Sequence, residues 1–193
     1  KPPPLPEEFL AAEFEYIANS AFQANEDRSK AASFFLVSVG SLVAAIFGAQ
    51  LLQGTPNQLL IVYRSIAGIF FVLTLLGALT VAQLARLRLA WYGAAEAMNK
   101  MKDFYMARNK NLADAFLWKT GSLPPQFKMD SISFYITLEV ALLSALTFGA
   151  FVYFSILSVN LLGGIWPISI GAGLVAFVAL LFLYKRMLTK KRK

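Results

Sequence analysis

The sequence contains neither histidine nor cysteine, and only 15% of its 193 residues are charged. Without cysteine the chain has no disulfide, no thiol nucleophile and no thiolate metal ligand. Without histidine it has no imidazole for general-base catalysis or for binding a metal or haem. The charged fraction is well below the roughly 25% that is typical of soluble domains. These absences exclude many enzyme classes and argue against a soluble fold.

Apolar residues are correspondingly abundant: they make up 58% of the chain, and the mean hydropathy is +0.58. A soluble domain of this size buries only about two-thirds of its chain surface, too little to hide so much apolar surface. Four stretches reach the length of about 20 residues that crosses about 30 Å of hydrocarbon. They are residues 33–52, 59–83, 132–158 and 165–184. Because lipid offers no partner for free backbone groups, each is predicted to be a helix, which makes the chain an all-α polytopic membrane protein.

Charge divides the chain into an acidic N-terminal segment, an apolar hairpin, a basic connecting segment, a second apolar hairpin and a basic tail. These segments are residues 1–32, 33–83, 84–131, 132–184 and 185–193. The net charges of the three polar segments are −3, +4 and +6. Uncharged turns with glycine and proline are predicted to close the hairpins at 53–58 and 160–167. Because basic residues stay on the cytoplasmic side, both termini are predicted to be cytoplasmic in a bacterial inner (plasma) membrane.

Heptad spacing of apolar residues continues from the first two spans into the polar segments. The N-terminal stripe includes Ala21, Ala24 and Arg28. With no proline inside 7–52 or 59–110, both spans are predicted to extend as long helices that form a cytoplasmic stalk, the acidic stem against the basic one. The stalk interface is predicted at Leu10, Phe14, Ile17, Leu87, Trp91, Met98, Met101 and Tyr105.

Two charged residues interrupt the apolar spans. Arg64 lies about 7 Å from the outer end of its span at 1.5 Å per residue, so its side chain is expected to reach the headgroups. A pore or lipid-headgroup contact is the alternative. Glu139 lies roughly 10 Å from the cytoplasmic end, where a carboxylate is costly and usually faces a bundle interior or cavity.

Other polar residues at the depth of Glu139 are expected to form a polar layer with it: Ser38, Ser41, Thr80 and Gln83. Three interpretations of Glu139 remain open at this point. The carboxyl group belongs to a structural hydrogen-bond layer, to an ion or proton path, or to a contact with a partner subunit.

Small residues recur every four positions in the first and third spans, a spacing that lets helices pack closely in lipid. They are Gly40, Ala44, Gly48, Ala141, Ala145 and Gly149. The contact is either within one chain or between copies. Residues 33–37 and 133–137 are also alike, which indicates either an internal duplication of the hairpin or shared membrane composition.

Basic residues of the connecting segment and tail are predicted to contact anionic lipid. They include Arg86, Arg88, Lys185, Arg186, Lys190 and Lys191. The alternative is an anionic ligand such as a nucleotide, or a nucleic acid stacked on nearby aromatic residues. No Walker or GxGxxG loop is present, so no cofactor is predicted and nucleic acid is not favoured as a partner. No catalytic motif or metal site is recognisable, and the chain is predicted not to be an enzyme.

The layout of residues 7–110 resembles the SLATT-type membrane effector proteins of bacteria. The corresponding parts are the polar helix 13–30, the two spans around the turn 53–58, and the helical continuation 86–105. This resemblance implies a self-associating effector that forms or gates a pore. The residues themselves favour a non-enzymatic membrane protein that acts through assembly, as an anchoring, accessory or scaffolding subunit. The alternative is a homo-oligomeric pore gated by the cytoplasmic helices, and in both cases the partners are the bilayer and other membrane subunits.

Overall fold

The computed structural model describes residues 6–49, 55–108, 116–159 and 165–189. These residues form α1 (Pro6–Gly48), α2 (Pro56–Arg108), the short 3-10 helix η2 (Thr120–Ser122), α3 (Ile132–Leu157) and α4 (Ile165–Thr189). All four α-helices are long and apolar enough to cross a membrane. The prediction of an all-helical chain with four long apolar helices is therefore confirmed. Part of each predicted hairpin turn lies outside the described residues.

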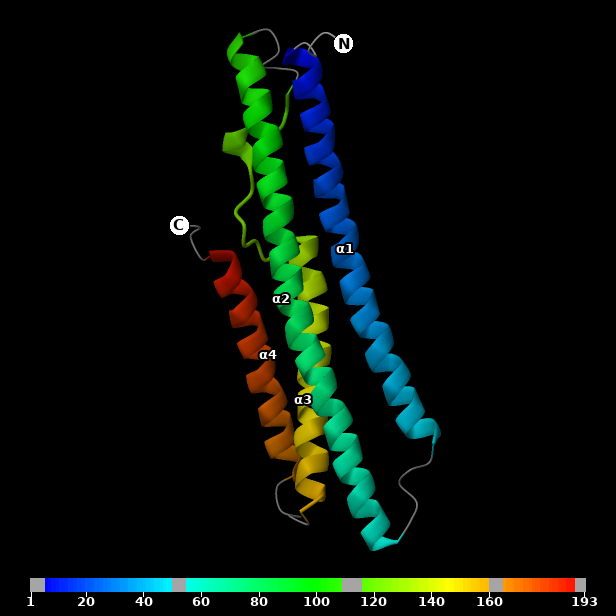
Figure 1. The fold of residues 1–193 in the computed structure, drawn as a ribbon. Coiled ribbons are helices and arrows are strands. Elements are labelled where there is room, and N and C mark those ends of the chain that lie inside the picture. The colour runs from blue at the N-terminus through cyan, green and yellow to red at the C-terminus, as the bar shows by residue number, and fades with distance from the viewer. Residues whose placement is uncertain (1–5, 50–54, 109–115, 160–164, 190–193) are drawn as a thin grey trace.

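The four helices differ in length, and this difference sets the architecture. With 43 and 53 residues, α1 and α2 are about 65 and 80 Å long at 1.5 Å per residue. With 26 and 25 residues, α3 and α4 reach only about 40 Å. α1 and α2 run antiparallel and continue past the ends of α3 and α4 (Figure 1). We call the half with all four helices the four-helix part and the remainder of α1 and α2 the two-helix part.

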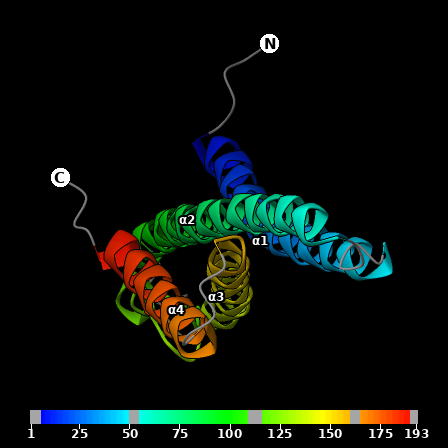
Figure 2. The same cartoon turned by 90° about the horizontal axis from the view of Figure 1, so that it is seen from below.

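α2 is the central helix of the molecule. It contacts all three other helices, whereas α1 packs mainly on α2 and α4 packs mainly on α3 (Figure 2). Phe35, Leu73 and Val140 come from three different helices and meet in the core, almost completely shielded. Gly77 of α2 permits this contact, because a Cβ at that position would lie 2.8 Å from Phe35 Cζ.

The backbones of α3 and α4 come close together at Gly149 and Gly173, where no side chain separates them. A Cβ on Gly149 would lie 3.1 Å from the Ser169 carbonyl oxygen, and a Cβ on Gly173 would lie 3.1 Å from the Ala145 carbonyl oxygen. Close backbone approach of this kind brings many atoms into dispersion contact, the main source of helix association in lipid. The second hairpin is therefore held together by small residues.

The two-helix part is built from the stripe that the heptad spacing predicts on α1, where Ala21, Ala24 and Arg28 are buried. On α2 the buried face is rotated by about one residue from the predicted stripe and centres on Arg88, Ala95 and Asn99. The eight residues of the predicted stalk interface are half-buried throughout.

The rotation of α2 has a physical reason in the segment before α3. This segment runs back along α2, where Asn99 Nδ2 donates a hydrogen bond of 3.0 Å to the Lys119 carbonyl oxygen. Arg88 Nε likewise donates, at 3.4 Å, to the Gln126 carbonyl oxygen. Because backbone carbonyl groups cover this face of α2, the buried residues Arg88 and Asn99 can donate hydrogen bonds to them. A stripe defined by apolar residues alone does not include these two positions.

Candidate functional site

Glu139 and Arg64, the two charged residues within the apolar spans, both lie on the outer surface of the four-helix part. Glu139 shares its exposed face of α3 with Tyr135, Leu142 and Leu146. Neither charge has an oppositely charged partner within 4.0 Å among the described residues. The structure therefore does not bring these two charges together, and it leaves Glu139 on an apolar outer face.

The four residues expected to surround Glu139 do not form a layer with it. Ser38 Oγ donates a hydrogen bond of 2.7 Å to the Phe34 carbonyl oxygen. Thr80 Oγ1 donates similarly to the Leu76 carbonyl oxygen at 2.9 Å. Ser and Thr hydroxyl groups in a helix can use the carbonyl group four residues earlier, so they need no partner on another helix. Ser41 and Gln83 are exposed.

A groove of about 440 Å³ lies between α1 and α2 on the outer surface. It has mixed polarity and includes two of the residues expected near Glu139. Its lining is Asp27, Lys30, Ala31, Phe34, Leu76, Leu79, Thr80, Gln83 and Leu87. These polar side chains therefore face outward along α1 and α2, away from the core.

A different set of polar residues does occupy the helix interfaces. Thr74 and Thr147 of α2 and α3 share a hydrogen bond of 3.1 Å between their hydroxyl oxygens. Ser133 of α3 and Tyr184 of α4 share another of 3.1 Å, and both side chains are almost fully buried. Thr137 Oγ1 donates to the Ser133 carbonyl oxygen at 2.8 Å.

Sequence reasoning missed this set, although its spacing on α3 carries a signal. The buried hydroxyl residues Ser133, Thr137, Ser144 and Thr147 recur at heptad-like intervals along one face. Every one of them has a hydrogen-bond partner. These hydroxyl groups therefore have a structural role, because their hydrogen bonds join α3 to α2 and α4.

The two predicted small-residue ridges have different surroundings. On α3, Ala141 and Ala145 are buried and Gly149 contacts α4. On α1, Gly40, Ala44 and Gly48 are exposed, and a Cβ on either glycine would meet nothing within 4 Å. The ridge of α3 is used inside the chain, whereas the ridge of α1 faces outward.

Arg28 of α1 and Arg88 of α2 are the buried charged residues of the described part, with 5% and 7% of their surfaces exposed. Neither guanidinium group has a carboxylate within 4.0 Å among the described residues. Arg28 Nη2 donates to Asn25 Oδ1, while its buried Nε has no partner. The Arg88 guanidinium carbon lies 4.7 Å from the centre of the Trp91 ring.

The electrostatics of this pair follow from burial and like charge. Burial lowers the pKa of the Arg28 guanidinium, and the nearby charge of Arg88 lowers it further, against a smaller opposing effect of the Tyr184 phenol. Burial also lowers the pKa of Arg88, while Tyr184 and Tyr92 oppose this. Both residues lie outside the apolar spans 33–52 and 59–83. Because arginine keeps its proton in proteins, the result is two buried positive charges, each with an unfavourable desolvation free energy.

The other predicted basic residues lie at the surface. Arg86, Lys185 and Arg186 are exposed, and Lys190 and Lys191 lie outside the described residues. Lys185 Nζ lies 5.6 Å from the centre of the Phe127 ring, close to the end of α4. The basic residues that the sequence singles out therefore divide into an exposed group and one buried residue, Arg88.

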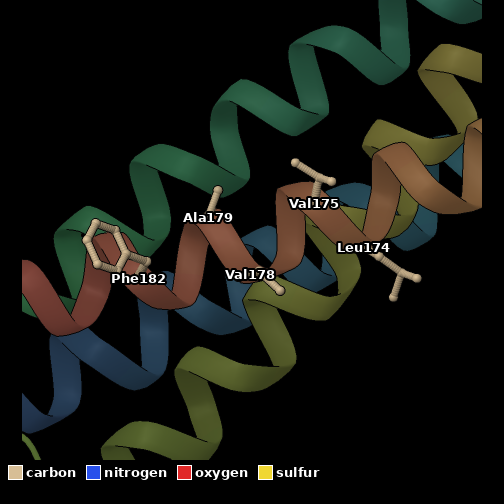
Figure 3. Close-up of a pocket in the computed structure, with 5 residues that line it drawn as sticks. All are labelled: Leu174, Val175, Val178, Ala179 and Phe182. Carbon is tan, nitrogen blue, oxygen red and sulfur yellow. The ribbon is translucent and has the colours of Figure 1, made fainter.

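The outer face of α4 holds a shallow groove of about 500 Å³ (Figure 3). All five lining residues belong to α4 and are apolar: Leu174, Val175, Val178, Ala179 and Phe182. This groove offers no polar group for chemistry, and its composition suits contact with lipid chains.

In the part of the chain that the structure describes, no group of three or more acidic side chains is arranged to hold a metal ion. A comparison with protein-family models, curated proteins and solved structures finds no match to this chain. Function must therefore be inferred from the chain's own residues.

Proposed function

We propose that this chain is a non-enzymatic integral membrane protein that acts through assembly, as an anchoring, accessory or scaffolding subunit of a membrane complex. The observation that carries the proposal is the exposure of Glu139 on the apolar outer face of α3. Intramembrane carboxylates usually face a bundle interior, a cavity or a partner. Because a single copy supplies none of these to Glu139, a neighbouring subunit is the simplest cover for it.

The outward ridge of α1 supports the same proposal. Gly40, Ala44 and Gly48 leave a shallow surface of the kind on which another helix packs closely. The equivalent small residues of α3 are already occupied by α4. We infer that α1 contributes the contact with a second subunit, while α2, α3 and α4 pack against one another within the chain.

In this proposal the four-helix part crosses the inner membrane and the two-helix part is a cytoplasmic stalk. The basic residues of α2 that follow the span 59–83, those near the end of α4 and those of the tail support this orientation. The span lengths also fit, since α3 and α4 exceed the roughly 30 Å of a hydrocarbon core by a modest amount.

Copy number tests the proposal most directly. The full-length protein is extracted in mild detergent and analysed by native mass spectrometry, with Gly40→Leu as the test variant. Gly68→Leu is the matched control, because Gly68 of α2 is also exposed with nothing within 4 Å of a built Cβ. We expect Gly40→Leu to release the chain from its complex and Gly68→Leu to leave the complex intact. A wild-type chain that runs as a single copy without other subunits would contradict the proposal.

A homo-oligomeric pore is the second candidate, and the position of Glu139 favours it too. Phe35, Leu73 and Val140 fill the centre of one copy, so a pore would lie between copies, with Glu139 repeating around its axis. The resemblance to SLATT-type effectors is in keeping with this arrangement. Ion flux through proteoliposomes separates the two candidates: a pore loses or changes its flux in Glu139→Gln, whereas an accessory subunit shows no flux in either form.

A further inference from the structure

We propose that Arg28 and Arg88 form a binding site for an anionic phosphate group, carried either by a phospholipid headgroup or by a soluble phosphate compound. The site lies where α1 and α2 pass the end of α4 and the start of α3. It is independent of copy number and of the contact proposed for α1.

The first support is that the two arginines carry more hydrogen-bond donors than the surrounding described residues have acceptors for. Each guanidinium group carries five N–H donors in a planar fork, which matches phosphate oxygens in a bidentate manner. The described residues offer the pair one side-chain acceptor at Asn25 and one long bond, of 3.4 Å, to the Gln126 carbonyl oxygen. Arg28 Nε is completely buried without a partner. An oxyanion bound at these guanidinium groups would satisfy N–H donors that the described residues leave without a partner.

The second support is that no carboxylate of the described residues lies within 4.0 Å of either guanidinium group. Glu26 precedes Arg28 by two residues, but it pairs with Lys30 at 3.1 Å. Asp27 lines the outer groove between α1 and α2. Two buried positive charges without an acid are unusual in proteins, because buried charges are normally paired. The missing negative charge is best supplied by a ligand.

The third support is the surroundings of the pair. Tyr184 lies near enough to both arginines to oppose the lowering of their pKa values by burial, and Lys185 follows it at the end of α4. Lys185 Nζ lies over the Phe127 ring, next to the Gln126 carbonyl that contacts Arg88. Basic pockets between helices at the cytoplasmic boundary are typical binding sites for lipid headgroups. A soluble phosphate compound would reach the same donors from the aqueous side.

The tryptophan beside the pair provides a direct reporter. Arg88 stacks over Trp91, and the other two tryptophans are Trp118 and Trp166. The full-length protein is therefore prepared with Trp118→Phe and Trp166→Phe and freed of lipid in a neutral detergent. Trp91 fluorescence is then titrated with three probes at constant ionic strength: inorganic phosphate, glycerol 3-phosphate and short-chain phosphatidylglycerol.

We expect a saturable change in Trp91 fluorescence with at least one probe, while chloride at equal ionic strength has no effect. Arg28→Gln and Arg88→Gln should each weaken binding at least about tenfold, from loss of one charge-assisted bidentate contact. Arg86→Gln is the matched control, since Arg86 is exposed on the same helix, and it should change binding by less than about twofold. A response to phosphatidylglycerol alone identifies a lipid headgroup, whereas a response to the water-soluble probes identifies a soluble ligand.

The unfolding temperature of the protein with its native arginines gives a second measurement that does not depend on variants. Ligands that bind only the folded state raise this temperature in a saturable way. We expect the same probe that changes Trp91 fluorescence to raise the unfolding temperature. The proposal is overturned if no probe raises the unfolding temperature or changes the fluorescence, or if Arg86→Gln weakens binding as much as Arg88→Gln.

Discussion

Gly77 is the position where one added methyl group should disturb the core most. A Cβ there would lie within 3 Å of the Ser144 side chain and 2.8 Å from Phe35 Cζ. Carbon atoms in good contact are about 3.5–4.0 Å apart, so α2 must move away from α3 by a substantial fraction of an ångström. Overpacking of this kind costs about 1–3 kcal/mol. The gain in helix propensity from glycine to alanine, up to about 1 kcal/mol, offsets part of this cost.

We therefore expect Gly77→Ala to lower the free energy of unfolding by about 1–2 kcal/mol. Thermal unfolding of the purified protein in detergent, followed by circular dichroism, measures the change. The second substitution Ser144→Gly removes the opposing side chain, which donates a long hydrogen bond of 3.4 Å across helices to the Thr74 carbonyl oxygen. Combined with Gly77→Ala, it should lower stability by less than the sum of the two single effects.

Gly68→Ala is the control for this experiment, because a Cβ on Gly68 of the same helix meets nothing within 4 Å. It should leave stability unchanged or slightly raised. Equal destabilisation by both alanines would refute the close approach of α1, α2 and α3 at Gly77. Because a glycine inside α3 has its own cost, Ser144→Gly alone is measured too, and a double variant whose loss equals the sum of the two single losses would show that Ser144 is not the side chain in conflict.

Three further substitutions test other parts of the structure. Tyr184→Phe should lower thermal stability by about 1–3 kcal/mol, because it leaves the buried Ser133 hydroxyl without its partner. Asn99→Ala should speed limited proteolysis of residues 116–131 relative to the four-helix part, because it removes the 3.0 Å bond to the Lys119 carbonyl oxygen. Glu139→Gln should change the stability of the single chain by less than about 0.5 kcal/mol, since its side chain is exposed, but should alter the amount of complex seen by native mass spectrometry.

The helices themselves could be predicted from the sequence because their signal is strong and local. Runs of about 20 apolar residues leave no alternative to a helix in lipid, and no proline interrupts the long helices between Pro6 and Gly48 or between Pro56 and Arg108. On α1, heptad spacing also identified the buried positions Ala21, Ala24 and Arg28. The length of the apolar runs, the positions of proline and one amphipathic stripe were sufficient to predict the helices and the buried face of α1.

The rotation of each span about its own axis could not be predicted in the same way. A span that is apolar on all sides has no stripe, so nothing local indicates that Glu139 faces outward while Thr137, two residues before it, is buried. That choice is made by packing, chiefly by the close contacts at Gly77 and Gly149. Polar residues at a similar depth were therefore not evidence of contact with one another.

The arginine pair shows a different limit. Heptad spacing placed Arg28 on the buried stripe of α1, but the α2 stripe drawn through Leu87 and Trp91 omitted Arg88. Arg88 is buried because the segment containing Gln126 covers it, a contact between residues 38 positions apart. The sequence offered one signal, the charged residue Arg28 at a heptad position. It could not show that Arg88 is also buried, because the contact with Gln126 exists only in the folded chain.

Among the described residues, two arginines are buried without an acid within 4.0 Å and one glutamate faces outward from an apolar span. These charges cannot neutralise one another within the described chain, because no ion pair of 4.0 Å or less joins them. We propose that a component from outside the chain neutralises each of them, and the two proposed components differ in kind. The guanidinium forks match a phosphate group, whereas Glu139, amid Tyr135 and Leu142, matches a helix of another subunit. Because Arg28 and Arg88 are buried whereas Gly40 is exposed, loss of phosphate binding in Arg88→Gln should leave copy number unchanged, and loss of assembly in Gly40→Leu should leave phosphate binding unchanged.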